Sequence, residues 1–383
     1  MKGARVFIPH DIIFNILERL PAKSILRFRG VCKSWSSLIS DPYFLLCHAH
    51  RAKPSVLLTR YTQPSLGLQL QPVRCTNTQT TTFEVRCPCL SLLASCDGLL
   101  CFQGIPFGTR RHYSPGYYYV CNPLTDEWIT LPEAWCNNGF LCAFYHHSSM
   151  NEYRLLRNSP YGYEILTIGA KEWRRITCLF DANPSPMLEF YVLHGPPSLD
   201  KPPISVHGKL HYLPTIGTPL IWLIIVFDID SEKFGLMSLP ESCRTKEWTI
   251  HESRLIELEG KLGVSTIAPD AMLDIWMLED YEKQVWVKRY RVQTTPRREQ
   301  ITWFKPLVVH DDGKALVDWR GDLVLYDFKH HTCRKIIIED GFRMTNLLYK
   351  ESLIRHEFFE TGYQTGFIIN LVSSFYLQQQ TSR

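Results

Sequence analysis

The stretch that decides the fold lies near the N-terminus, where residues 6–44 read VFIPHDIIFNILERLPAKSILRFRGVCKSWSSLISDPYF. Pro9 suits the first turn of a helix, where a missing N–H costs nothing. Apolar residues then recur at helical spacing and form one continuous face, which Pro21 ends. This face comprises Ile12, Ile13, Ile16, Leu17 and Leu20.

Two further short helices are expected before residue 43. The second begins near Ser24 and is broken by Gly30, and the third carries an apolar stripe that includes Val31 and Trp35. Asp41-Pro42 is expected to close the helical unit. Three helices in about forty residues bury too little surface to fold alone. The unit therefore needs a partner protein or, alternatively, packs as a terminal cap on the rest of the chain.

The same stretch resembles an F-box, the module that docks a substrate receptor onto the Skp adaptor of Skp–cullin–F-box ubiquitin ligases. The match runs through Ile8-Pro9, Asp11, Ile16-Leu17, Arg19-Leu20-Pro21, Lys23-Ser24, Arg27-Phe28-Arg29, Val31-Cys32-Lys33-Ser34-Trp35 and Ile39-Ser40-Asp41-Pro42. It departs from the usual pattern at Ile8, Asn15 and Gly30, and Gly30 could loosen the joint between the second and third helices. The resemblance implies that the adaptor is contacted by Ile8, Pro9, Ile12, Ile13, Ile16, Leu17, Leu20, Pro21, Ser24, Ile25, Val31, Cys32 and Trp35.

Charge is concentrated at the same end of the chain. The net charge of all 383 residues is +4, whereas residues 1–60 hold ten Lys and Arg against three Asp and Glu. A basic module suits an acidic protein partner, such as the Skp adaptors that the resemblance implies. Nucleic acid is the weaker alternative, because the positive residues interleave with an apolar face.

Composition also bounds the cellular setting. Residues 1–5 are followed by Pro9 rather than an apolar run, so no signal peptide is expected, and the apolar stretch 220–227 is too short to cross a membrane. The thirteen cysteines are an odd number without paired zinc-ligand spacing, which predicts reduced thiols and no metal or other cofactor. The chain is expected in the cytoplasm, the nucleus or both.

Beyond residue 55 the pattern changes to short strands between turns. A glycine turn entering a strand recurs in Asp97-Gly98, His207-Gly208, Glu259-Gly260 and Arg320-Gly321. The first gap between these glycines is about twice the others, as if one copy had decayed. A second phrase places an aromatic residue just after a charged turn, at Trp128, Trp173, Phe234 and Trp286.

Repeats of roughly fifty residues with these features are typical of propeller blades. The alternative is a pair of β-sandwiches with the aromatics in ordinary cores. Residues 95–101 and 121–132, SCDGLLC and CNPLTDEWITLP, resemble the F-box-associated interaction domain of plant F-box proteins, as do 227–229 and 237–240. We therefore predict an α+β multidomain chain: a three-helix F-box at 5–50, then a mainly β, propeller-like domain of repeated blades at 55–375, closed from Leu57 to Phe375.

The sequence contains no GxSxG, P-loop, GxGxxG after a strand, or HExxH motif. The resemblance implies a non-catalytic receptor that holds a protein substrate near the ubiquitin-loaded subunits of a ligase, reached through the Skp adaptor, a cullin and a RING subunit. Two alternatives stay open: a ligase-independent scaffold, and a kelch-type propeller enzyme. No nucleic acid or membrane partner is expected.

Substrate contacts are expected on long loops at one end of the propeller. Two segments qualify, 103–119 and 181–203, because they are rich in aromatic, Arg and Pro residues, and Arg and Tyr are common in binding hot spots. Tolerated surface insertions are the alternative. The candidate residues are Arg110, Arg111, His112, Tyr113, Tyr117, Tyr118, Phe190 and Tyr191.

Overall fold

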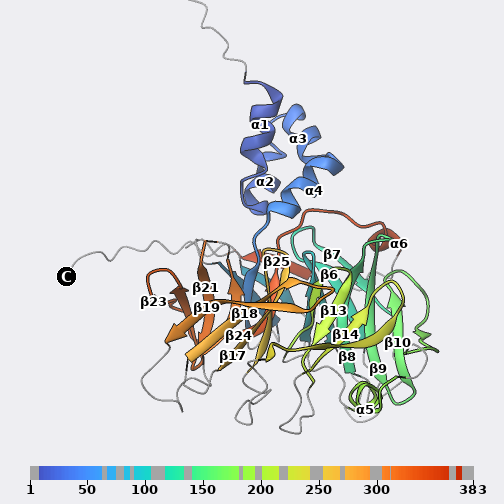
Figure 1. Cartoon of the computed structure of the whole chain (residues 1–383). Helices are drawn as coiled ribbons and strands as arrows, with labels where there is room; N and C mark the ends of the chain where they lie inside the picture. Colours follow the sequence, from blue (N-terminus) through green and yellow to red (C-terminus); the bar gives the residue numbers. More distant parts are fainter. Residues whose placement is uncertain are drawn as a thin grey trace, which may run out of the picture.

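The chain folds into a small helical module that stands on one end of a ring of β-sheets (Figure 1). The computed structural model describes residues 8–62, 67–74, 82–86, 90–104, 117–132, 140–180, 184–194, 201–214, 223–241, 253–267, 272–293, 304–310, 312–361 and 368–372. Within these ranges no helix is long and apolar enough to cross a membrane.

The helical module contains four helices, one more than the sequence pattern predicts. They are α1 (His10–Leu17), α2 (Ala22–Phe28), α3 (Lys33–Ser40) and α4 (Pro42–Arg51). Asp41 accepts hydrogen bonds through Oδ1 from the backbone N–H groups of Tyr43 (2.9 Å) and Phe44 (3.2 Å), and Pro42 occupies the first helical position. The prediction that Asp41-Pro42 ends the unit is wrong, because this pair caps and starts a further helix.

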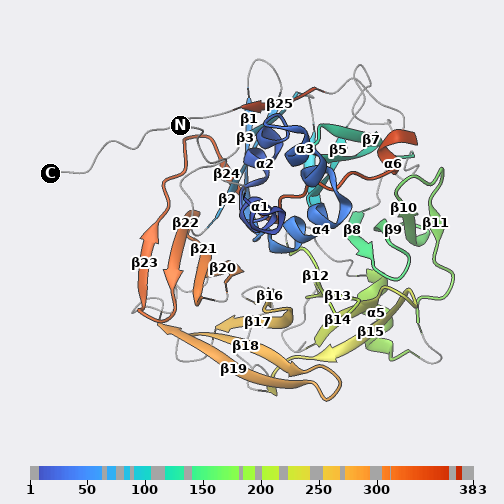
Figure 2. The same ribbon diagram turned by 90° about the horizontal axis from the view of Figure 1, so that it is seen from above.

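Six sheets surround a central axis (Figure 2). The first is β4 (Ser91–Cys96), β5 (Leu99–Gly104), β6 (Tyr117–Asn122) and β7 (Glu127–Thr130), and the second is β8 (Phe140–His147), β9 (Glu152–Ser159), β10 (Gly162–Thr167) and β11 (Arg174–Arg175). The third is β12 (Ile204–Val206), β13 (Lys209–Tyr212), β14 (Leu223–Asp228) and β15 (Lys233–Ser238). The fourth is β16 (Arg254–Leu258), β17 (Lys261–Ile267), β18 (Met272–Asp280) and β19 (Val285–Gln293).

The fifth sheet is β20 (Phe304–Val309), β21 (Lys314–Trp319), β22 (Asp322–Asp327) and β23 (Thr332–Lys335). Short helices α5 (Pro186–His194) and α6 (Phe358–Thr361) lie outside the sheets. The first strands of neighbouring sheets contact one another around the axis: β4 with β8, β12 with β16, and β16 with β20. This arrangement confirms the predicted propeller and excludes a pair of β-sandwiches.

The sixth sheet joins the two ends of the propeller. Its order is β24 (Arg343–Tyr349), β1 (Ser55–Thr62), β2 (Gly67–Val73), β3 (Thr82–Arg86) and β25 (Ile368–Val372). β24 is the inner strand and pairs antiparallel with β1, with Val56 opposite Leu348, and β25 pairs with β3 at the outer edge. Strands from both ends of the chain thus share one blade, and the ring closes through main-chain hydrogen bonds.

The recurring glycine turns occupy equivalent places in three blades and a different place in a fourth. Asp97-Gly98, His207-Gly208 and Glu259-Gly260 each join a first strand to a second, and all six residues have positive φ. Such a two-residue turn matches the strand twist and favours glycine. Arg320-Gly321 joins β21 to β22, a second strand to a third, so it is not a copy of the same turn. The missing copy is the β8–β9 turn, which contains Asn151 at positive φ instead of glycine.

The aromatic residues that follow the charged turns occupy equivalent places in four blades, as the repeat predicts. Trp128, Phe234 and Trp286 lie in the fourth strand of their sheets, and Trp173 lies just before a fourth strand. Trp128 and Phe234 are buried. Trp173 packs on Tyr118, with ring centroids 5.8 Å apart, and the Trp286 indole N–H donates to the Ser238 carbonyl of the preceding blade at 3.0 Å. These side chains therefore fill the gaps between blades.

A buried carboxylate ties the helical module to the propeller. Glu351, two residues after β24, is 6% exposed. Its Oε2 accepts a hydrogen bond from the Ala22 N–H at the start of α2 (3.1 Å), and its Oε1 pairs with Arg74 at 3.1 Å. Leu17, Ala22 and other core residues of the helices form one apolar cluster with β1, β2 and β24. The module is thus packed on the propeller rather than tethered to it.

Truncation tests the closure. A chain ending at residue 361 loses β25, which covers only the outer edge, and we expect it to unfold cooperatively with a Tm near that of the full chain. A chain ending at residue 341 also loses β24, the inner strand that carries the buried Tyr349, and we expect an insoluble or non-cooperative protein. A chain of residues 1–341 that is soluble and melts cooperatively would contradict the prediction that β24 is needed to close the ring.

The Glu351 contact can be tested separately. Glu351→Gln removes the charge that serves both the α2 N–H and Arg74, and we expect the free energy of unfolding to fall by about 1–3 kcal/mol. The control is Glu339→Gln, because Glu339 is 42% exposed in its pair with Arg60 and such pairs contribute about 1 kcal/mol or less. Urea denaturation measures both. Equal decreases in the free energy of unfolding for the two variants would show that Glu351 does not hold the helical module on the propeller.

Candidate functional site

Three exposed isoleucines lie on α1 and just before its first residue. Ile12 and Ile16 lie four residues apart and share one face of the helix, and Ile8 comes just before its N-cap Pro9. The three side chains are 46%, 52% and 49% exposed, respectively. The opposite face packs inward through Leu17 and Phe14. We call Ile8, Ile12 and Ile16 the isoleucine row. An apolar row of this kind on a small module is typical of a protein-binding surface.

The interior of the module corrects two of the predicted adaptor contacts. Leu17 and Ile25 are fully buried in the cluster that continues into the propeller. Their side chains are already covered, so they hold the helices together and cannot contact a further protein. Helical spacing predicts that a position is apolar, but it does not reveal which side of a short helix its own chain covers.

The other predicted contact residues fall into two groups. Leu20, Ile13 and Trp35 are partly buried against the same cluster, and Ser24 is also partly buried. The Trp35 ring packs edge-on against Phe28 at 5.5 Å. The exposed group comprises Ile8, Pro9, Ile12, Ile16, Pro21, Val31 and Cys32, of which Val31 is 59% exposed.

Two exposed apolar residues were missed by the sequence interpretation. Tyr43 and Leu46 on α4 are 68% and 48% exposed. Tyr43 stacks on Phe14 of α1 at 6.0 Å, which places α4 beside α1. The signal was present in Asp41-Pro42, which is a good helix start, but it was interpreted as the end of the unit.

Positive charge borders the module along α2. Lys23 and Arg27 lie four residues apart, on the same side of the helix. Partial burial lowers the pKa of Lys23, and the neighbouring Arg27 lowers it further. Like charges held this close favour a partner that brings negative charge.

The helices are anchored by polar contacts on their propeller side. The Arg51 guanidinium pairs with the buried Glu18 carboxylate at 3.0 Å. His48 is also buried, and its Nε2 lies 2.9 Å from the Leu20 carbonyl. These contacts join α4 to the end of α1 within the helical module.

The predicted substrate residues are dispersed. Arg110, Arg111, His112 and Tyr113 lie outside the described residues, as do the side chains of Tyr117 and Tyr191. Tyr118 is 2% exposed and packs against Trp173 between blades, so its prediction as a surface contact is wrong. Phe190 on α5 is 47% exposed and remains accessible.

Titratable groups of the propeller serve its packing. Burial lowers the pKa of His211 to about 4, and its two ring nitrogens lie 3.0 Å from the Ile204 carbonyl and 2.7 Å from the Tyr281 hydroxyl. Burial raises the pKa of the Cys142 thiol to about 12. In the part of the chain that the structure describes, no three His, Cys, Asp or Glu side chains are grouped to hold a metal ion, and the eight cysteines there are free.

Comparison with known proteins matches this architecture. A family model of the F-box domain matches residues 8–47, and one described as the F-box associated beta propeller domain matches residues 45–359. Among curated relatives, the F-box protein At5g49610 of Arabidopsis thaliana is 28% identical, over 74% of this chain and 78% of its own.

Two other Arabidopsis thaliana relatives align over more of the chain. The putative F-box protein At4g09190 is 27% identical over 90% of each chain, and the F-box/kelch-repeat protein At4g19930 is 24% identical over 87% of this chain and 85% of its own. Among solved structures, AztD of Citrobacter koseri aligns at 14% identity and a TM-score of 0.37, over 78% of this chain and 89% of that one, which is too low to bear on function. The chain belongs to the F-box proteins that carry an F-box associated beta propeller domain.

Proposed function

We propose that this protein is a substrate-recognition subunit of a Skp–cullin–F-box ubiquitin ligase. Residues 5–50 dock on a Skp-type adaptor, which links the chain to a cullin and a RING subunit, and residues 55–375 capture a protein substrate for ubiquitination and degradation. The protein itself is non-catalytic and acts in the cytoplasm, the nucleus or both. The observation that carries the proposal is the exposed isoleucine row on an F-box module.

The chemistry of the module suits this partner. The isoleucine row supplies an apolar centre, and Lys23 and Arg27 on α2 supply a basic border. Interfaces of this kind have an apolar core and a charged rim. In this proposal the ligase gains rate through proximity, because the receptor holds the substrate beside the ubiquitin-loaded subunit and no group of the receptor reacts.

The isoleucine row gives the direct test. Changing Ile12 and Ile16 together to alanine should weaken adaptor binding by about thirtyfold or more, the loss typical of a hot spot, because both side chains are already exposed and their loss leaves the module folded. Binding of purified Skp adaptor to the full chain, measured by calorimetry, checks this result.

The matched control is Val285→Ala with Val287→Ala on β19, since these side chains are 45% and 47% exposed on the propeller. The control pair should bind the adaptor as the unchanged protein does. Unchanged affinity in the Ile12 and Ile16 variant would refute the docking surface. Adaptor binding without co-purifying cullin would favour a scaffold that works outside a ligase.

The substrate segments are tested by a second set of changes. Phe190→Ala should leave the Tm and adaptor affinity unchanged, because changes at exposed side chains alter the free energy of folding by less than about 0.5 kcal/mol. If Arg110, Arg111 and Tyr113 serve substrate binding, changing them together to alanine should have the same outcome. Each should reduce the number of proteins that accumulate on proteasome inhibition and co-purify with the chain. A lowered Tm would assign these residues to packing instead.

A further inference from the structure

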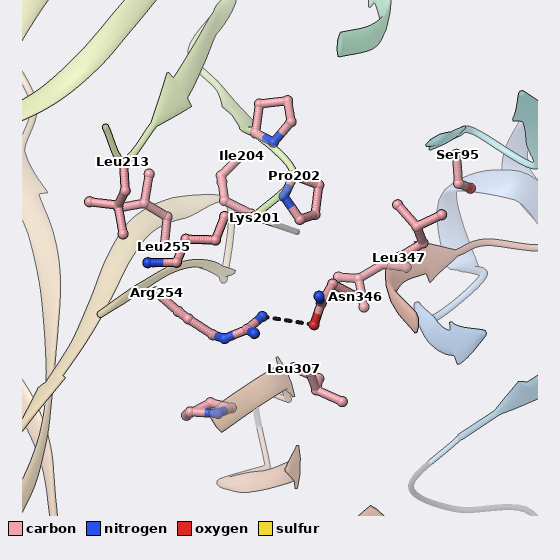
Figure 3. Close-up of a pocket in the computed structure, with 13 residues that line it drawn as sticks. Ser95, Lys201, Pro202, Ile204, Leu213, Arg254, Leu255, Leu307, Asn346 and Leu347 are labelled. Atoms are coloured by element: carbon pink, nitrogen blue, oxygen red, sulfur yellow. Dashed lines mark hydrogen bonds between the residues drawn. The ribbon is translucent and has the colours of Figure 1, made fainter. Parts of the chain in front are cut away.

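The axis of the propeller offers little room for a protein ligand. A cavity of about 130 Å³ lies among the inner strands, and Pro202, Leu255 and Leu307 are among its lining residues. A hydrogen bond of 2.9 Å from the Arg254 guanidinium to the Asn346 Oδ1 joins two blades across it (Figure 3). Pockets for drug-sized ligands occupy about 300–1,000 Å³, so this cavity is too small for a peptide segment. Recognition of such a segment is therefore left to the outer surfaces of the blades.

The second blade has one end near the helical module and one end remote from it. Tyr153, near the start of β9, packs on His356 with ring centroids 5.0 Å apart. His356 follows closely after Glu351, which binds the N-terminus of α2, so this end of β9 faces the module side. The opposite end, where β8 begins at Phe140 and β9 ends at Ser159, lies away from the module, on the side of α5 (Figure 1).

Three side chains follow one another along this remote end of the blade. Phe140 opens β8, Tyr161 lies in the turn between β9 and β10, and Arg175 ends β11. The sheet order β8, β9, β10, β11 places Tyr161 between the other two. The register agrees, because Phe140 lies opposite Asn158 and Arg175 lies opposite Glu164, each close to the same turn. We call Phe140, Tyr161 and Arg175 the aromatic edge.

The two rings of the aromatic edge face solvent. Phe140 is 61% exposed and Tyr161 is 67% exposed, more than any member of the isoleucine row. Aromatic side chains bury a large apolar area when a partner covers them, and tyrosine is enriched among the residues that dominate binding energy. These rings are therefore suited to anchor an apolar side chain of another protein.

The turn that carries Tyr161 is stabilised from within. The Ser159 hydroxyl donates to the Gly162 carbonyl at 3.0 Å and accepts from the Tyr161 N–H at 3.3 Å. Pro160 restricts the backbone further, and Gly162 has a φ of 112°, which favours glycine. An aromatic side chain on such a turn loses little conformational freedom when a partner binds.

Arg175 adds a positive charge to the rings. Its guanidinium carbon lies 5.5 Å from the centroid of the Tyr161 ring, within the range of a cation–π contact. The carboxylate opposite it in the register, Glu164, is bound by Arg157 at 2.6 Å. Among the described residues no carboxylate lies within ion-pair distance of Arg175. The ring thus orients the guanidinium without neutralising it, and a carboxylate of a partner fits its fork geometry.

The dimensions of the aromatic edge fit an extended peptide. Neighbouring strands lie about 4.8 Å apart, so the three steps from β8 to β11 span about 14 Å. An extended chain advances about 3.3 Å per residue, so about four residues cover this distance. α5 is bound to the same blade, because the Tyr163 hydroxyl donates to the Val192 carbonyl at 2.8 Å. The surface therefore adjoins the helix that carries the candidate residue Phe190.

We propose that the aromatic edge docks an extended acidic segment of the protein substrate, with an apolar side chain on Phe140 and Tyr161 and a carboxylate on Arg175. Charge complementarity selects an acidic partner, because the charged member of the edge is a cation. The inference rests on the proposed function for the identity of the partner as a substrate. Binding of an acidic peptide to the edge needs neither the adaptor nor the ligase.

Peptide selection on the full chain tests the proposal. The probe is a phage-displayed library of random peptides of about ten residues, and the selected peptides should carry Asp or Glu within about four residues of an apolar residue. Fluorescence anisotropy of the most enriched peptide then measures affinity. Tyr161→Ala should weaken binding by about thirtyfold, the loss typical of a hot spot, and Arg175→Gln by about tenfold, the loss of a charge-assisted hydrogen bond.

The matched control is Arg334→Gln. Arg334 is exposed on β23, the outermost strand of the fifth sheet, as Arg175 is on the outermost strand of the second. The control removes the same charge and should bind the peptide within about twofold of the unchanged protein. An equal loss in the control would show that net charge attracts the peptide, and would overturn the proposal.

Charge reversal gives an independent check. Arg175→Glu should lose the acidic peptide and bind the same peptide with lysine in place of its acidic residues. If Tyr161→Ala fails to fold, the Arg175 variants decide alone, because Arg175 is exposed on a two-residue strand.

Three results overturn the aromatic edge as a docking surface. They are a selection that enriches no peptide, enriched peptides without acidic residues, and an enriched peptide that binds the Tyr161 and Arg175 variants as tightly as the unchanged protein. None of these measurements uses the adaptor. Failure of the aromatic edge and failure of adaptor docking are therefore separate outcomes.

Discussion

The ladder between β1 and β24 is the constraint on which the rest of the structure depends. β1 starts four residues after α4 ends, and β24 leads directly to Glu351, which binds the N-terminus of α2. One antiparallel pairing therefore closes the ring and also fixes the helical module on it. Arg74 strengthens the joint, because its side chain contacts both Glu351 and Ser55 at the start of β1.

The direction of the first strands divides the propeller into two different ends. Turns between first and second strands are tight and lie on the module side, where Gly98 packs against Ser352 with no room for a side chain. Connections from second to third strands return on the far side, as between Gly104 and Tyr117. The meander thus places the ends of the second strands and the starts of the third strands on the side away from the helices.

The sequence predicted the elements with strong local signals and failed where tertiary context decides. Helical periodicity identified Ile12 and Leu17 alike as apolar, yet only packing determines that Ile12 is exposed and Leu17 buried. The glycine phrase predicted the blades, but Gly321 occupies a different turn, because any tight hairpin with positive φ favours glycine. The contact between Glu351 and the Ala22 N–H could not be predicted from the sequence, since the two residues are 329 positions apart and meet only when the chain has folded.

Rigid coupling between the two ends matters for a receptor that works by proximity. A flexible tether would let the substrate end sample many orientations, and each would lower the effective concentration of substrate at the ubiquitin-loaded subunit. Here the apolar cluster is continuous from Leu17 of α1 to Tyr349 of β24. The buried Glu351 accepts a hydrogen bond from the Ala22 N–H and so orients α2 on the propeller. Under the proposed function, a substrate bound to the propeller would therefore keep a fixed position relative to the isoleucine row, because one apolar cluster joins the helices to the blades.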